Sequence, residues 1–161
     1  MKNKIYIETS VVSYYVAERS NDIRIAGHQL STIDMWKQLS EFDVYISDIV
    51  LEEAGKGSQD QSDARLFTIK DFQILKRNEK ILELTNALLV KKAIPEKCPE
   101  DAAHIAIAAF YNIDYIVTWN FKHINNPFMK KKIRKIIGDK GYIYCKRLKN
   151  KLPESANNSS F

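Results

Sequence analysis

The stretch from Asp101 to Asn125, DAAHIAIAAFYNIDYIVTWNFKHIN, places the strongest constraint on how this chain can fold. It begins with a carboxylate and continues through about ten apolar or small residues, a pattern typical of a buried helix. After a turn at Asn112, a short apolar run from Tyr115 to Val117 ends in the polar residues Thr118-Trp119-Asn120. This order predicts a helix, a tight connection, a strand and an exposed strand end, which is half of an α/β unit.

Two features of this stretch point to function. Asp101 lies four residues before Ile105 and seven before Ala108, so one helical face carries the carboxylate above an apolar stripe. The polar corner at residues 118–120 follows the predicted strand, and open α/β sheets place their ligand sites at the C-terminal ends of strands. We therefore expect functional side chains from other parts of the chain to meet at this corner.

The 161 residues are enough for one domain with a buried core, and no segment has the composition of a linker. We expect a single domain over residues 1–152 and a polar, frayed tail over residues 153–161. No apolar run reaches the roughly 18 to 20 residues of a membrane span, and the first ten residues are too charged for a signal peptide. A cytoplasmic protein is the expectation.

Strands and helices alternate along the rest of the chain. Residues 4–8, KIYIE, predict a first strand, with Ser10 as the N-cap of a helix over residues 11–17. A helix over residues 25–39 is expected to bury Ile25, Leu30, Ile33, Trp36 and Leu39, and a final strand is expected over Tyr142 to Tyr144. This alternation predicts an α/β fold with a mainly parallel sheet between two helical layers.

Two further carboxylates are candidates to reach the same edge of this sheet. Glu8 ends the first predicted strand. In the predicted helix over residues 48–56, helical spacing puts Glu53 on the apolar face and Glu52 beside Asp48 on the opposite, solvated face. An acid on an apolar face is costly unless it is paired, protonated or bound to a metal.

Glu8, Glu53 and Asp101 are therefore the candidate catalytic and metal-binding residues. Converging carboxylates raise one another's pKa unless a cation is present, and Mg²⁺ and Mn²⁺ prefer such oxygen ligands. A cation of this kind can polarise a phosphodiester and generate the attacking hydroxide. Among the histidines, His123 follows the polar corner and is the better functional candidate. His104, three residues after Asp101, could be a ligand, but its helix is rich in small residues, which favours a packed or surface side chain.

The charge distribution suggests a polyanionic partner. Residues 122–151 contain 11 Lys and Arg and one acid, whereas the rest of the chain has 14 basic and 19 acidic residues. A solvated lysine-rich helix is the alternative explanation for this basic strip. If the strip binds nucleic acid through its phosphates, the candidate residues are Lys122, Lys130, Lys131, Lys132, Arg134 and Lys135.

Motifs of several other chemistries are absent from the sequence. There is no glycine-rich phosphate loop, no G-x-S-x-G nucleophile motif and no C-x-x-C pair. Cys98 and Cys145 are isolated, which indicates reduced thiols rather than a disulfide or part of a zinc site.

Four pieces of the chain, IYIETS, ISDIVLEEA, DAAHIAIAA and DYIVTWNFKHI, together resemble the PIN-domain nucleases, in particular the VapC-like toxins of bacterial toxin–antitoxin modules. The resemblance implies a three-layer α/β/α sandwich and Mg²⁺- or Mn²⁺-dependent endoribonuclease activity on RNA. It also implies inhibition by a small antitoxin protein, and often a homodimer.

Within this resemblance, Glu8, Glu53 and Asp101 match three acids of the family, with Glu8 standing where an Asp is usual. The fourth acidic position departs from the pattern, because Asn120 and His123 stand where acids are expected. Asn120 could offer an amide oxygen and Thr118 a hydroxyl, and Ser10 is a further supporting residue. The loss of charge leaves an alternative, a catalytically weak or inactive RNA- or protein-binding module on the same fold.

Overall fold

A parallel sheet forms the centre of the computed structural model, which describes residues 1–145 and 147–149. Its strands run in the order β3-β2-β1-β4-β5, and each neighbouring pair is parallel. The strands are β1 (Lys4–Ile7), β2 (Asp43–Ser47), β3 (Gln73–Leu75), β4 (Tyr115–Val117) and β5 (Arg147–Lys149). The expected tail over residues 153–161 lies outside the described residues.

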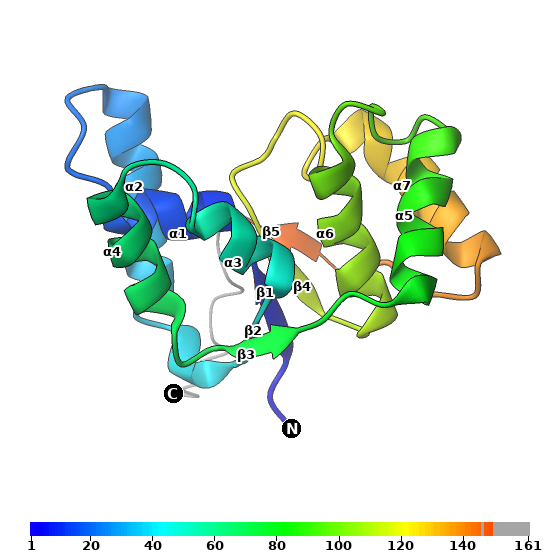
Figure 1. Ribbon diagram of the computed structural model, residues 1–161, viewed down its shortest axis with the longest axis horizontal. Coiled ribbons are helices and arrows are strands. Elements are labelled where there is room, and N and C mark those ends of the chain that lie inside the picture. Colours follow the sequence, from blue (N-terminus) through cyan, green and yellow to red (C-terminus); the bar gives the residue numbers. More distant parts are fainter. Residues whose placement is uncertain (146, 150–161) are drawn as a thin grey trace, which may run out of the picture.

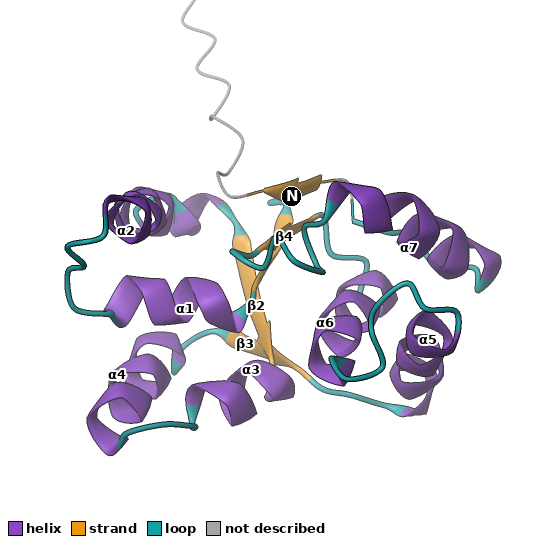
Figure 2. Ribbon diagram, turned by 90° about the horizontal axis from the view of Figure 1, so that it is seen from above, coloured by secondary structure: helices purple, strands orange, loops and turns teal. Residues whose placement is uncertain are grey.

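Helices cover both faces of the sheet (Figure 1). Seen from above, α1 to α4 lie on one side of the sheet and α5 to α7 on the other (Figure 2). This arrangement confirms the expected α/β fold with helical layers around a parallel sheet. The helices are α1 (Thr9–Val16), α2 (Ile23–Trp36), α3 (Asp48–Ala54), α4 (Gln59–Ile69), α5 (Glu79–Val90), α6 (Pro99–Phe110) and α7 (Pro127–Asp139), with a 3₁₀ turn, η1 (Leu39–Glu41).

Strand β1 and helix α6 supply many of the buried residues of the core. Ile5, Tyr6 and Ile7 are completely buried, as expected for a central strand covered on both faces. Every residue of α6 from Ala102 to Ala109 is buried as well. Its alanines let the helix lie close to its neighbours, so the carboxylate in its first turn is held on a rigid element.

Strand register brings the polar residues to one edge of the sheet. Ile7 lies opposite Val117 in the β1–β4 pair, and the Glu8 N–H continues this ladder by donating to the Val117 carbonyl oxygen across 3.1 Å. Glu8 and Thr118, which follow these two residues, are therefore neighbours at the carboxyl ends of their strands. Ser47 ends β2 at the same edge.

The expected buried face of the second helix was wrong at three of its five positions, whereas Leu39 is buried and Trp36 packs against the core as expected. Ile25, Leu30 and Ile33 are 39%, 51% and 39% exposed, while Gln29, Thr32 and Met35 are buried. The polar residues are buried because they have specific partners. Gln29 bonds the backbone of the Ala17–Ser20 connection, and Thr32 accepts a hydrogen bond from the Trp119 indole. Hydrophobic periodicity does not register such contacts.

Two expected boundaries were also wrong. The first helix starts at Thr9, and its N-cap is Glu8 rather than Ser10, because the Glu8 carboxylate reaches back to the Ser10 N–H. The last strand is Arg147–Lys149 rather than residues 142–144. The chain turns at Gly141, where φ is +82°, and the side chains of Tyr142 and Tyr144 pack against the core instead of pairing with β4.

Among the described residues no helix combines the length and apolarity that crossing a bilayer requires.

Candidate metal centre

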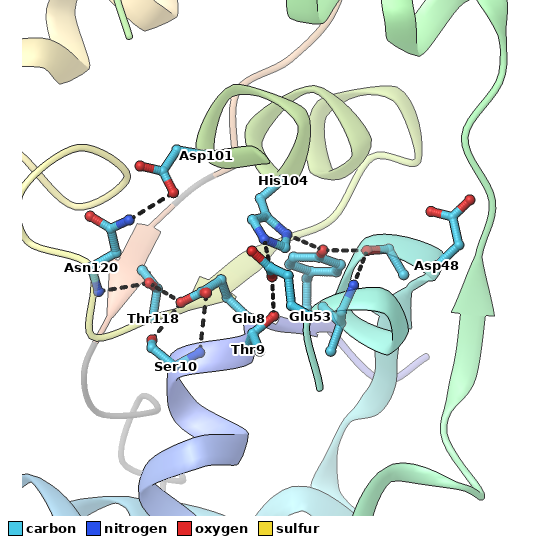
Figure 3. A network of polar contacts seen from close by, with 12 residues as sticks. Glu8, Thr9, Ser10, Asp48, Glu53, Asp101, His104, Thr118 and Asn120 are labelled. Carbon is cyan, nitrogen blue, oxygen red and sulfur yellow. Dashed lines mark hydrogen bonds and ion pairs between the residues drawn. The ribbon is translucent and has the colours of Figure 1, made fainter. Parts of the chain in front are cut away.

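Glu8 is held by three donors at the end of β1 (Figure 3). Its side chain caps α1 by accepting from the Ser10 N–H at 3.1 Å, and it also accepts from the hydroxyls of Ser10 and Thr118. Only 6% of the residue is exposed. The Ser10 hydroxyl accepts in turn from the Trp119 N–H, and the Thr118 hydroxyl from the Asn120 N–H. Ser10 and Thr118 thus orient the carboxylate, and each hydroxyl oxygen already accepts one backbone hydrogen bond.

Glu53 projects from α3 toward the same edge. One carboxylate oxygen accepts from the Thr9 hydroxyl and from His104 Nε2, the latter at 3.0 Å. Burial opposes ionisation of Glu53, but the hydrogen bonds and charge of its partners hold its pKa below the ordinary value. Glu52 lies on the other side of the helix, where it shares Arg77 with Asp48. The two adjacent acids therefore separate as helical spacing predicted.

A buried chain of hydrogen bonds supports Glu53 from behind. His104 Nδ1 lies 2.6 Å from the Tyr6 hydroxyl, which lies 2.7 Å from the Ser47 hydroxyl. Because a carboxylate only accepts, Nε2 carries the proton toward Glu53, and in the neutral imidazole Nδ1 then accepts from Tyr6. Burial raises the pKa of Tyr6, so this hydroxyl remains a donor. Burial lowers the pKa of His104, but the bond to Glu53 and the nearby negative charges outweigh it and raise the pKa overall.

Asp101 is held by Asn120 and His123, the two residues that stand where the sequence resemblance led us to expect acids. Asn120 Nδ2 donates to one carboxylate oxygen at 3.0 Å, and His123 Nδ1 donates to the other at 2.6 Å. The amide orientation is determined by the His123 backbone N–H, which donates to Asn120 Oδ1 at 2.9 Å. The amide oxygen of Asn120 is therefore turned away from Asp101.

The described residues form two groups of metal-ligand atoms rather than one. Glu8 and Glu53 group with His104, and Asp101 groups with Cys98 and His123, with the ligand atoms of each group within 4.8 Å of one another. The three predicted carboxylates thus lie at one edge of the sheet but are not gathered around a single point. Figure 3 shows the separation, with Asp101 and Asn120 on one side of Glu8 and with Glu53 and His104 on the other.

A cavity of about 500 Å³ opens beside Glu53. Its floor is apolar, with Ile49, Ile81 and Ala103, and its rim carries charged side chains that include Arg77 and Glu100. It lies between α3, α5 and the start of α6. The cavity gives the Glu53 side of the site access to solvent.

An aromatic cluster covers the opposite side of the site. Trp119 stacks on His28 with ring centroids 4.1 Å apart, and Tyr14 packs edge-on against both rings. Phe121 leans on Trp119 at 6.1 Å and keeps 44% of its surface exposed. Its members come from α1, α2 and the loop after β4, so no local sequence pattern marks them as a cluster.

The basic candidates gather on and just before α7. Lys122, Lys131, Lys132, Arg134 and Lys135 are exposed, whereas Lys130 is half-buried. Burial and the charge of Arg134 lower the pKa of Lys130. Ile133, Ile136 and Ile137 are buried beneath them, so α7 presents its cations on the outer face.

Sequence reasoning missed two members of the two groups of metal-ligand atoms, Cys98 and His104 as a partner of Glu53, and it also missed Tyr6, which hydrogen-bonds His104. All three carried a usable signal in the sequence. Tyr6 precedes Glu8 by two residues, which puts both on one face of β1. His104 and Cys98 lie three residues after and before Asp101, one helical turn away on the same face.

Comparisons with known proteins identify a solved structure with a similar fold. No protein-family model matches the chain, and no curated protein matches it in sequence. Among solved structures it is similar to a chain in the crystal structure of VapBC2 from Rickettsia felis bound to a DNA fragment from their promoter. The two chains are 20% identical with a TM-score of 0.54, over 73% of this chain and 88% of that one. At this identity the likeness establishes the fold alone.

Proposed function

We propose that this chain is a metal-dependent endoribonuclease, the VapC-like toxin of a bacterial toxin–antitoxin pair, and that it acts in the cytoplasm. One observation carries the proposal. Glu8, Glu53 and Asp101 lie at the carboxyl edge of a parallel sheet, and no Lys or Arg within the described part of the chain forms an ion pair with any of them. Apart from the two histidines, the described groups that contact these carboxylates carry no positive charge, so this edge of the sheet keeps a negative charge that favours a divalent cation.

The donor set fits Mg²⁺ or Mn²⁺. All three side chains offer carboxylate oxygens, and the side chains of Glu53 and Asp101 are 24% and 20% exposed, so a cation and its waters can reach them. When bound, such a cation would polarise a phosphodiester and lower the pKa of an attacking water. Glu8, Glu53 and Asp101 are the proposed ligands; because Asp101 lies in the other ligand group, it would reach a cation on Glu8 and Glu53 through a bound water or after rotation of its side chain.

The surrounding residues hold these ligands in position. Ser10 and Thr118 orient Glu8, Thr9 and His104 orient Glu53, and Asn120 and His123 orient Asp101. Each of these groups donates a hydrogen bond to a carboxylate oxygen, so the rotamers of the three carboxylates are restricted. In this proposal they are positioning residues and do not touch the substrate.

We propose that RNA binds across the site toward α7. The exposed Lys and Arg of α7 would neutralise phosphates, and Lys122 lies on the loop between Asn120 and this helix. Phe121, exposed on the same loop, offers a ring face on which an unpaired base can stack. Phosphate contacts carry no sequence information, so cleavage specificity would come from elsewhere.

Two partners belong to the proposal. The structurally similar VapBC2 and the sequence resemblance both support an antitoxin protein that binds this chain. The exposed apolar side chains of α2, Ile23, Leu30 and Ile33, are available to such a partner. A homodimer is expected from the resemblance.

A second function is favoured by the state of Asp101. Both of its oxygens are occupied by Asn120 and His123, and neither replacement supplies negative charge. If these contacts persist when metal is offered, the chain would be a binding module that holds RNA or protein without cleaving it.

One experiment separates the two functions. Purified protein and its Asp101→Asn variant are incubated with mixed RNA in Mn²⁺, in Mg²⁺ and in EDTA, with Asp60→Asn on exposed α4 as a matched control. Cleavage by the wild type and the control, lost in EDTA and in Asp101→Asn, supports the nuclease. Salt-sensitive RNA binding without cleavage by any of the three supports the binding module, and equal cleavage by Asp101→Asn means a contaminant.

A further inference from the structure

Asp101 belongs to a cluster of three different ligand types on the outer side of the site. The Cys98 thiol, the Asp101 carboxylate and the His123 imidazole each offer one atom, and these atoms lie within 4.8 Å of one another. Cys98 directly precedes α6, Asp101 is in its first turn, and His123 comes from the loop after β4. Neither Glu8 nor Glu53 is part of this cluster.

The local backbone leaves the Cys98 thiol available. Pro99 starts α6 and Cys98 occupies the N-cap position, where side chains usually accept a hydrogen bond from the helix. Cys98 makes no such bond, although its own N–H donates to the Pro95 carbonyl oxygen at 2.9 Å. Its side chain is half-buried, and its position three residues before Asp101 puts both on one side of the first turn.

His123 is held in place from two directions. Its backbone N–H donates to Asn120 Oδ1 at 2.9 Å, and its Nδ1 donates to Asp101 at 2.6 Å. Its side chain is 7% exposed against 20% for Asp101. The imidazole and the carboxylate are thus preorganised, and little ordering remains for a ligand to impose.

The chemistry of this donor set differs from that of three carboxylates. Mg²⁺ takes oxygen ligands, whereas sulfur and imidazole nitrogen together select borderline and softer ions such as Zn²⁺. Three protein ligands with one open position is the arrangement of zinc sites that keep a bound water. The substitution of His123 for an acid therefore changes which metal the site prefers as well as its charge.

We propose that Cys98, Asp101 and His123 bind a single transition-metal ion of the Zn²⁺ class. The ion takes the thiolate sulfur, one carboxylate oxygen and one imidazole nitrogen, with a water in the fourth position. Binding releases the thiol proton, whereas the neutral imidazole keeps its proton: it stays on Nδ1 if the ion takes Nε2, and it moves to Nε2 if the ion takes Nδ1. The proposal is independent of nuclease activity, because neither the ligands nor the readout below requires RNA cleavage.

Cobalt provides the test, because a Co²⁺–thiolate bond produces a charge-transfer absorption that oxygen and nitrogen ligands do not. Full-length protein stripped of metal is titrated with Co²⁺, then with Zn²⁺, in excess Mg²⁺ throughout. We expect the charge-transfer band to saturate at one equivalent, to survive the Mg²⁺ and to disappear as Zn²⁺ displaces Co²⁺. Co²⁺ held only by Glu8, Glu53 and His104 would bind without this band.

Variants identify the ligands. In Cys98→Ser the band should vanish and Co²⁺ affinity should fall at least about 10-fold, the loss typical of altering even a supporting residue. His123→Gln should weaken Co²⁺ binding to a similar degree while keeping the thiolate band at high Co²⁺. Cys98→Ser is expected to fold, because serine is a favourable N-cap; circular dichroism checks this.

Cys145→Ala is the matched thiol control. Cys145 is buried, and burial raises the pKa of its thiol to about 12, so it supplies no thiolate at neutral pH. The band should be unchanged in this variant. A wild-type protein that binds Co²⁺ without a charge-transfer band, or a band that survives in folded Cys98→Ser, overturns the proposal.

Discussion

His123 Nδ1 lies 2.6 Å from a carboxylate oxygen of Asp101 and donates a hydrogen bond to it. The other oxygen accepts from Asn120, whose amide is oriented by the backbone of the same histidine. Two residues that stand where acids were expected thus act as hydrogen-bond donors to the acid that remains. These two hydrogen bonds stabilise the metal-free site, and a cation must compete with them for the Asp101 carboxylate.

An acid placed at position 120 should destabilise the metal-free site and strengthen metal binding. In Asn120→Asp the donor to Asp101 is replaced by a second negative charge, so the free energy of unfolding of the metal-free protein should fall by about 1–3 kcal/mol. Mn²⁺ should then bind more tightly and raise the melting temperature more than it does in the wild type. Thermal unfolding with and without Mn²⁺ measures both effects.

The matched control for this change is Asn112→Asp. Asn112 occupies an exposed turn with φ of +52°, a conformation that aspartate tolerates. It should alter neither stability nor the response to Mn²⁺. An Asn120→Asp protein that is as stable as the wild type without metal would mean that the contact with Asp101 contributes nothing.

Removing the Tyr6 hydroxyl should destabilise the core without changing its packing. Tyr6→Phe leaves His104 Nδ1 without its hydrogen-bond partner and removes one of the two partners of the Ser47 hydroxyl, which keeps the bond from the Val50 N–H. Because both groups are buried, the free energy of unfolding should fall by about 1–3 kcal/mol. Urea denaturation followed by circular dichroism measures the loss.

Tyr45→Phe provides the comparison for this variant. Tyr45 lies on the neighbouring strand β2, is half-buried, and takes no part in the Ser47–Tyr6–His104 chain of bonds. Its substitution should change stability by only a few tenths of a kcal/mol. Equal losses of unfolding free energy in the two variants would show that Tyr6 does not stabilise the protein through the Ser47–Tyr6–His104 hydrogen bonds.

The His104–Glu53 pair should make the stability of the metal-free protein depend on pH. The pKa of His104 is raised, so its contribution is complete below its ordinary pKa of 6.5 and is lost as pH rises through the raised value. The pKa of Glu53 is lowered, so its contribution is complete above 4.5 and is lost as pH falls through the lowered value. The pair should therefore stabilise most between pH 4.5 and 6.5.

The difference in unfolding free energy between wild type and His104→Gln isolates this effect, measured in EDTA from pH 4 to 9. It should be largest in the window named above and decline toward both ends. Glu52→Gln serves as the control, because Glu52 pairs with exposed Arg77 and does not contact the histidine. A difference that stays constant with pH would rule out a charged pair.

The outer face of α7 should govern the salt dependence of RNA binding. Lys131 and Lys132 are both exposed, and neither takes part in an ion pair with the described residues. In the double variant Lys131→Gln/Lys132→Gln, the slope of log affinity against log salt should shrink by about 0.7 for each lysine that contacts phosphate. Binding of a single-stranded RNA over a range of salt concentrations measures the slope.

A double variant elsewhere on the surface tests whether net charge alone explains the result. Lys37→Gln/Lys70→Gln removes the same charge at the ends of α2 and α4, and both lysines are exposed. The slope should remain that of the wild type. If both double variants change it equally, the lysines of α7 have no special role.

Much of the fold followed from local patterns. Alternating strands and helices predicted the parallel sheet, because such connections leave both faces to be covered. Helical spacing predicted that Glu52 and Glu53 would separate, and the structure places one on Arg77 and the other on His104. The roles of Glu8, Glu53 and Asp101 in holding metal stay predictions.

The errors arose where a specific hydrogen bond outweighed a local pattern. Gln29 and Thr32 are buried in α2 because the Ala17–Ser20 connection and the Trp119 indole supply their hydrogen bonds. Glu8 displaces Ser10 as the first N-cap because its carboxylate can fold back onto the helix it precedes. Neither partner is visible in a hydrophobic period.

The sequence by itself determined the elements, their order and the acids at the carboxyl ends of the strands, since these depend on side-chain periodicity and on residues close along the chain. Only the tertiary structure decided which ligands share a group. Asp101 turns toward Cys98 and His123, and Glu53 turns toward His104, because hydrogen bonds from the loop after β4 and from α6 orient each carboxylate. Where segments that are distant in the sequence meet, such hydrogen bonds set the direction in which each side chain points.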